Sequence, residues 1–157
     1  MKLYHGSTID IAKVDLALSK PNKDFGRAFY LSDDRQQALE MAQFRAEFEE
    51  TEPVVNVYEF DEALFQEFRY KRFEAYTEEW AHFVYDHRTE PHGRTLHDYD
   101  IVYGPIANDR VGAQIVRYKQ GYITFDEFLR RIQYIKGITF QYAFCTQKAI
   151  DKLIKVK

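Results

Sequence analysis

The amino-acid sequence predicts an α+β domain, on three observations. Segments typical of strands and of helices alternate along the 157 residues without the regular rhythm of a doubly wound sheet. The segment Val54 to Phe60 is rich in β-branched and aromatic residues, as strands are. Capping residues stand before several helical segments, as in Thr77-Glu78-Glu79-Trp80, where Thr77 is the expected N-cap. These patterns favour helices packed around a sheet, within one domain that spans residues 1–157.

The N-terminal part is expected to begin with a strand, because Lys2 to His5 is followed by a turn at Gly6-Ser7. A second strand covers Ala28 to Leu31, and Ser32 or Asp33 is placed to cap the helix that follows. The periodicity of this helix predicts one face that carries Ala38, Met41, Ala42, Arg45 and Phe48.

The middle of the chain continues with the strand at 54–60 and a short helix capped by Asp61. A partner strand is expected at Tyr70 to Tyr76, and the helix that Thr77 opens comes next. The polar segment Arg88 to Asp98 contains Pro91 and Gly93 and is interpreted as a surface loop.

The C-terminal part predicts a strand at Tyr99 to Tyr103, ended by Gly104-Pro105, and a second strand at Ile138 to Cys145. An edge strand is expected at Ile154 to Val156. Three helices are predicted from their capping residues, which are Asn108, Thr124 or Asp126, and Thr146.

Composition excludes several classes of protein. A hydrophobic fraction of 45% and an aromatic fraction of 17% support a packed core and argue against disorder. The net charge of −3 argues against a protein that holds nucleic acid by charge alone. No signal peptide and no apolar run of about 20 residues is found, so no membrane partner is expected. Cys145 is the single cysteine, which rules out an internal disulfide and favours a cytoplasmic protein.

The segment Asp24 to Leu31, read together with Tyr4 to Ser7, is the strongest candidate for a ligand site. Gly26 is a turn residue, and Tyr30 on the strand after it could stack on a flat ring. The loop also carries basic side chains that could face an anion, namely Lys20, Lys23 and Arg27.

These two segments resemble the His-Gly-Ser/Thr strand and the Phe-Gly-Lys-Gly-Ile-Tyr-Phe segment of poly(ADP-ribose) polymerases and diphtheria-toxin-type ADP-ribosyltransferases. Almost the whole chain is similar to a group of small bacterial proteins catalogued as a domain of unknown function within that superfamily. The segments that carry the resemblance are Leu3–Ser7, Lys23–Leu31, Gln37-Ala38, Glu79-Trp80, Tyr99–Asp109 and Gln141–Thr146. The resemblance implies an ADP-ribosyltransferase-like split β-sheet core with surrounding helices.

The resemblance also implies a function. We expect an NAD-dependent mono-ADP-ribosyltransferase that transfers ADP-ribose from NAD, its co-substrate, to an unknown protein or nucleic-acid acceptor. Members of the resembled group look like toxins of bacterial toxin–antitoxin or defence systems, so a small antitoxin partner is expected. The alternatives are an NAD glycohydrolase, an RNA phosphotransferase-like activity on the same fold, and a module that binds NAD or ADP-ribose without turnover.

Site roles follow residue by residue from the resemblance. His5 is expected to bond the adenosine ribose, while the backbone of Gly6 and the hydroxyl of Ser7 hold the nicotinamide amide. Tyr30 is expected to pack against the nicotinamide ring. The loop residues assigned to NAD binding are Lys23, Gly26 and Arg27, of which the two basic ones would face the pyrophosphate. Ala28 departs from the family pattern, which has a glycine there.

The third catalytic residue is assigned to Gln141, where the family has a glutamate on a late strand. The alternation of strand side chains places Gln141, Ala143 and Cys145 on one face and the aromatic residues between them on the other. A glutamine can bond a ribose hydroxyl but brings no negative charge, so polymer elongation is not expected. Asp100, in a sequence that ends in Ile-Val-Tyr, is the alternative and could act as a general base.

Two further sets of residues have open or negative interpretations. Asn108 stands before a helix whose free N–H groups could hold an anion or contact the acceptor, or it is simply a capping residue. The histidines recur every five residues, which on a helix separates neighbours by about 140° and matches no zinc ligand spacing, so no metal is expected. They are His82, His87, His92 and His97.

Overall fold

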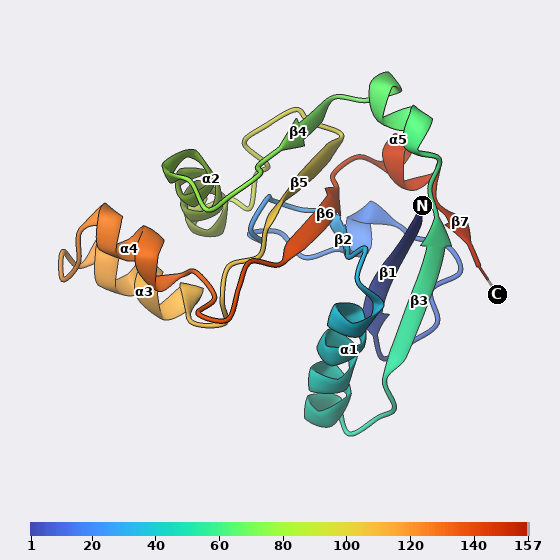
Figure 1. Ribbon diagram of the computed structural model, residues 1–157, viewed down its shortest axis with the longest axis horizontal. Coiled ribbons are helices and arrows are strands. Elements are labelled where there is room, and N and C mark those ends of the chain that lie inside the picture. The colour runs from blue at the N-terminus through green and yellow to red at the C-terminus, as the bar shows by residue number, and fades with distance from the viewer. Residues whose placement is uncertain (157) are drawn as a thin grey trace.

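The computed structural model describes residues 1–156 and has an α+β fold, as the sequence predicts, in which the strands form two sheets (Figure 1). The first sheet has the order β1-β3-β7 and is antiparallel throughout. Its strands are β1 (Lys2–Ser7), β3 (Val54–Glu59) and β7 (Ile154–Lys155).

The second sheet has the order β2-β6-β5-β4, and β4 pairs with β5 in parallel. Its strands are β2 (Phe29–Leu31), β6 (Phe140–Phe144), β5 (Ile101–Pro105) and β4 (Tyr70–Arg72). The strands β5 and β6 join distant parts of the chain, so the sheet depends on pairing that local sequence does not specify.

Within residues 1–156 a single β-bridge connects the backbones of the two sheets. Tyr4 and Ser32 exchange two hydrogen bonds, with N···O distances of 2.7 and 2.8 Å. On the far side of this bridge β1 and β2 separate, which leaves a split between the two sheets.

Helix α1 (Arg35–Glu49) covers the face of the first sheet, where it crosses β1 at Gly6 (Figure 1). Its buried side chains are Ala38, Ala42 and Ala46. The predicted apolar face is therefore correct for the alanines and wrong for Met41 and Phe48, which are exposed. A row of alanines lets the helix backbone approach the glycine, and the larger apolar side chains then face outward.

Three helices cover the outer face of the second sheet and appear together on the left of Figure 1. They are α2 (Glu78–Thr89), α3 (Val111–Lys119) and α4 (Phe125–Arg131). Thr77 and Thr124 cap α2 and α4 through hydrogen bonds to backbone N–H groups, as predicted. The core beneath them is built around Trp80 and Phe128, both without exposed surface.

A second core fills the space between the two sheets. Leu3 and Tyr58 from the first sheet meet Phe29 and Phe144 from the second. The alternation predicted for β6 is confirmed, because Phe144 enters this core while Ala143 faces the helices. The remaining short helical turns are Leu16–Leu18, Glu62–Glu67 and α5 (Gln147–Ile150).

Some predicted boundaries are wrong for identifiable reasons. Gly6-Ser7 lies within β1, and Gly104-Pro105 lies within β5, so neither pair is a turn. A Cβ at Gly104 would stand 2.9 Å from Phe25 Cζ, so this glycine serves close packing. Helix α1 is capped by Asp34, one residue later than expected. Within residues 1–156 no helix has both the length and the apolar character needed to cross a membrane.

Candidate functional site

The split between the sheets exposes unpaired backbone groups at Gly6 and Tyr30. In an antiparallel ladder alternate residues bond to the same neighbouring strand, so Gly6 and Tyr30 would form the next bonded pair after Tyr4 and Ser32. That pair is not formed. Because Tyr4 and Ser32 turn their N–H and C=O groups toward each other, alternation turns those of Gly6 and Tyr30 to the same side, and among residues 1–156 no backbone hydrogen bond joins Gly6 to Tyr30. Two donors and one acceptor therefore point into the split.

His5 lies at this position with a defined tautomer. Its Nδ1 is 2.6 Å from the carbonyl oxygen of Tyr30, which can only accept, so Nδ1 carries the proton and donates. Burial lowers the pKa of His5 to about 4, and the positive charge of Arg45 acts in the same direction. The ring is therefore neutral at pH 7 and presents Nε2 as a hydrogen-bond acceptor. Such an acceptor suits a ribose hydroxyl.

Ser7 is buried in the same strand, with 3% of its surface exposed. Its Oγ accepts a long hydrogen bond of 3.4 Å from the N–H of Ile9, so the hydroxyl proton is still available. The side chain leaves β1 on the face that His5 also uses, because the two residues are two positions apart. The structure thus brings Gly6, Ser7 and His5 to the same end of the split.

Tyr30 forms a wall beside the split, and its hydroxyl is committed to the preceding loop. The hydroxyl donates to the carbonyl of Gly26 at 2.8 Å and accepts from the N–H of Phe25 at 2.9 Å. Burial raises the pKa of Tyr30 well above its ordinary value, so the phenol stays neutral. Gly26 has φ +89°, and this backbone conformation, which favours glycine, makes the tight loop possible.

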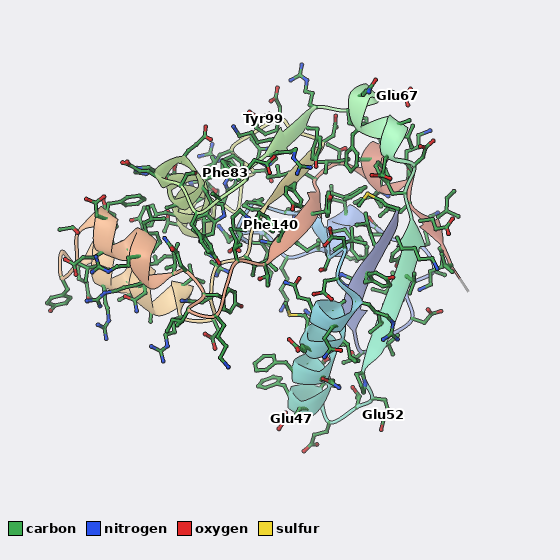
Figure 2. The ribbon with its side chains drawn as sticks, in the orientation of Figure 1. Glu47, Glu52, Glu67, Phe83, Tyr99 and Phe140 are labelled. Carbon is green, nitrogen blue, oxygen red and sulfur yellow. The ribbon has the colours of Figure 1, made fainter. Side chains whose placement is uncertain are left out.

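Gln141 lies on the same sheet face as Tyr30, because Tyr30 pairs with Ala143 and Gln141 stands two positions before Ala143 on β6. It follows Phe140, which is labelled at the start of β6 in Figure 2. Its Nε2 donates to Oδ2 of Asp24 at 3.2 Å, and Oδ1 of the same carboxylate accepts from Nε of Arg88 at 2.6 Å. Asp24 and Arg88 stand far from Gln141 in the sequence, so no local pattern indicates that they join it.

Basic side chains from different elements converge near the loop. Burial is the largest cause that lowers the pKa of Lys23, followed by the positive charges of Arg88, Lys20 and Arg45. Arg45 comes from α1 and Arg88 from α2, so the basic cluster of Lys20, Lys23, Arg45 and Arg88 combines loop residues with residues of two helices. Arg27, by contrast, donates to the carbonyl of Ser19 and holds the loop itself together.

Two neutral histidines, His87 and His97, form hydrogen bonds near the loop that contains Phe25. Nε2 of His97 donates to the carbonyl of Phe25 at 2.9 Å, and Nδ1 of His97 accepts from the N–H of Tyr99 at 3.0 Å. Nδ1 of His87 donates to Phe83, labelled in Figure 2, and its Nε2 accepts from the N–H of Leu96. Burial lowers the pKa of both histidines. Each ring is held by one donated and one accepted bond, which requires the neutral form.

Asp100 is not brought to the split. Gln141 pairs with Gly104 on β5, and Asp100 stands four positions before Gly104. At 3.3 Å per residue, Asp100 and Gln141 therefore lie about 13 Å apart along the strands. Burial would raise the pKa of Asp100, but bonds from the backbone of Arg69 and the hydroxyl of Thr146 outweigh it and lower the pKa. This carboxylate therefore has a structural role, because it links Arg69, just before β4, to Thr146, just after β6.

Asp100 lines a separate cleft of about 470 Å³. Cys145 also lines it, and burial raises the pKa of this thiol to about 12, which makes it a poor nucleophile. Asn108 is likewise structural. Its Nδ2 donates to the carbonyls of Arg131 and Gln133, at 2.8 and 3.0 Å, and its Oδ1 accepts from the N–H of Arg110. These bonds leave the amide no free donor for an acceptor substrate.

A family model described as Protein of unknown function (DUF3990) matches residues 1–155. No curated protein and no solved structure matches the chain.

Proposed function

We propose that this chain, which belongs to the DUF3990 family of proteins of unknown function, is an NAD-dependent mono-ADP-ribosyltransferase with a split-sheet core of the ADP-ribosyltransferase type. The observation that carries the proposal is the missing backbone pair between Gly6 and Tyr30. A carboxamide has one acceptor and two donor hydrogens, and it fits a strand edge that offers both an N–H and a C=O. The nicotinamide of NAD has such a group.

The side chains around the split suit the rest of NAD. In the proposed complex the ring of nicotinamide lies against Tyr30, and Nε2 of His5 accepts a hydrogen bond from the adenosine ribose. The diphosphate, which is an anion, meets the basic cluster of Lys23, Arg45 and Arg88.

The reaction breaks the bond between the nicotinamide nitrogen and C1′ of the ribose. The bonding electron pair leaves with nicotinamide, and C1′ develops positive charge, as in glycoside hydrolysis. A nucleophile of the acceptor then forms a bond to C1′ and gives up its proton to solvent or base. In the proposed complex Gln141 bonds the ribose hydroxyl while this charge builds.

Incubation with NAD labelled in its adenosine part, in the presence of a cell lysate, tests the proposal. Transfer releases nicotinamide and leaves label on macromolecules. Glycohydrolysis releases nicotinamide and leaves free labelled ADP-ribose. A module that only binds NAD releases neither nicotinamide nor ADP-ribose, but NAD raises the melting temperature of the protein. The last outcome is the second candidate function, because the carboxamide of Gln141 brings no charge of its own to the ribose.

A further inference from the structure

We propose that Asp24 is a positioning residue of this site. This inference rests on the proposed function. The buried carboxylate of Asp24 orients Gln141 and supplies negative charge behind it. The pair Asp24–Gln141 then takes the part that a single glutamate has in the enzymes that this chain resembles.

Asp24 differs from the other buried carboxylates. Asp24, Glu90 and Asp100 are 6%, 7% and 2% exposed. Glu90 and Asp100 accept hydrogen bonds from backbone N–H groups, as structural carboxylates commonly do. Within residues 1–156 Asp24 accepts from side chains alone. One of its oxygens meets Arg88 and the other meets Gln141, the residue assigned to the ribose.

The contact decides which end of the Gln141 carboxamide faces the ligand. A carboxylate accepts and does not donate, so Nε2 must point to Asp24 and Oε1 must point away. No hydrogen bond from residues 1–156 reaches Oε1. The group presented to the ligand is therefore an acceptor, which is what a ribose hydroxyl requires.

The location of Asp24 ties this orientation to the rest of the site. It directly precedes Phe25, whose N–H donates to the hydroxyl of Tyr30. The same loop thus fixes the ring of Tyr30 and the carboxamide of Gln141 relative to each other. A negative charge 3.2 Å from Nε2 also polarises the carboxamide, so that Oε1 becomes a stronger acceptor as positive charge develops on the sugar.

Exchange of the two groups tests the inference in the intact chain. Asp24→Asn removes the charge at nearly constant shape, and we expect nicotinamide release to fall at least tenfold in kcat, with KM for NAD changed less than threefold. Gln141→Glu places two carboxylates in contact, and we expect a similar loss at pH 7 that is smaller at lower pH, where the pair holds one proton. The double variant Asp24→Asn with Gln141→Glu restores one charge and one amide, and we expect it to regain at least a third of the wild-type kcat.

Asp98→Asn is the matched control, because Asp98 also pairs with an arginine but is exposed and lines the cleft that contains Asp100. We expect it to keep wild-type turnover. Melting temperatures separate misfolding from loss of catalysis, and the double variant keeps a hydrogen bond between the two positions if Asp24→Asn alone is unstable. Wild-type turnover in Asp24→Asn, or a double variant no faster than Asp24→Asn, would overturn the role of Asp24 and leave the proposed function intact. A wild-type protein that neither cleaves nor binds NAD would overturn both.

Discussion

Nδ1 of His5 donates a hydrogen bond of 2.6 Å to the carbonyl oxygen of Tyr30, at the point where β1 and β2 part. The imidazole takes the acceptor that the backbone of Gly6 would otherwise use. This bond occupies the acceptor of Tyr30, fixes the tautomer of His5 and leaves Nε2 as a hydrogen-bond acceptor. The structural role of Nδ1 and the proposed ligand role of Nε2 can be tested separately.

His5→Asn separates them, because the amide nitrogen of asparagine can reproduce the donor at Nδ1 while the acceptor at Nε2 is lost. We expect a melting temperature close to that of the wild type and at least tenfold weaker NAD binding, measured by isothermal titration calorimetry. His5→Ala removes both groups, and we expect it to lose stability by about 1–3 kcal/mol as well as turnover. Full NAD affinity in both variants would contradict the assignment of His5.

Tyr30→Phe removes a hydroxyl that satisfies two backbone groups of the loop. The N–H of Phe25 and the C=O of Gly26 lose their partner, so we expect a loss of about 1–3 kcal/mol in the free energy of unfolding. Tyr122→Phe is the control, since Tyr122 is 77% exposed and should change stability by less than about 0.5 kcal/mol. Urea denaturation measures both. Equal stability of the two variants would mean that the loop does not depend on this hydroxyl.

Gly6→Ala tests the close approach of α1 to β1. The new Cβ would lie 2.1 Å from the carbonyl oxygen of Ala38 and 2.8 Å from the nitrogen of Ala42, so helix backbone has to move. We expect destabilisation of about 3 kcal/mol or more, seen as a lower urea midpoint. Gly112→Ala, at a helical position with nothing within 4 Å, should instead stabilise by about 0.5–1 kcal/mol. The reverse order of the two variants would refute this packing.

Stability is expected to fall in mild acid, because burial lowers the pKa of His5 to about 4 and lowers those of His87 and His97. An unfolded histidine has a pKa of about 6.5, so the unfolded chain binds more protons below that pH. The stabilisation is complete above pH of about 6.5 and is lost as the pH falls toward 4. The share of His5 alone is about 2 kcal/mol by pH of about 5.

Thermal denaturation from pH 7.5 to 5 measures this loss. His5→Asn lacks the titrating ring and should show a shallower dependence on pH than the wild type. The two remaining histidines should keep part of the slope. A flat profile in the wild type would show that the three rings are accessible to protons in the folded chain.

Particular residues show why local sequence misleads. Glycine and proline are common in turns, so the sequence predicts that strands end at Gly6 and Gly104. Both lie inside strands, where a glycine is needed for close packing: a Cβ at Gly6 would meet the backbone of α1, and one at Gly104 would meet the ring of Phe25. Periodicity placed Met41 and Phe48 on the inner face of α1, but the contact with Gly6 selects the alanine row.

The sequence by itself determined the α+β class, most of the capping residues and the two faces of β6, because these depend on neighbours within a few positions. It also singled out His5, Gly6, Ser7 and Tyr30, which the structure brings to one split. Only the tertiary structure decided that Asp24 and Arg88 accompany Gln141, and that Asp100 and Asn108 serve the scaffold. Contacts across 117 and 64 positions of the chain arise from how strands and helices pack, and no local pattern encodes them.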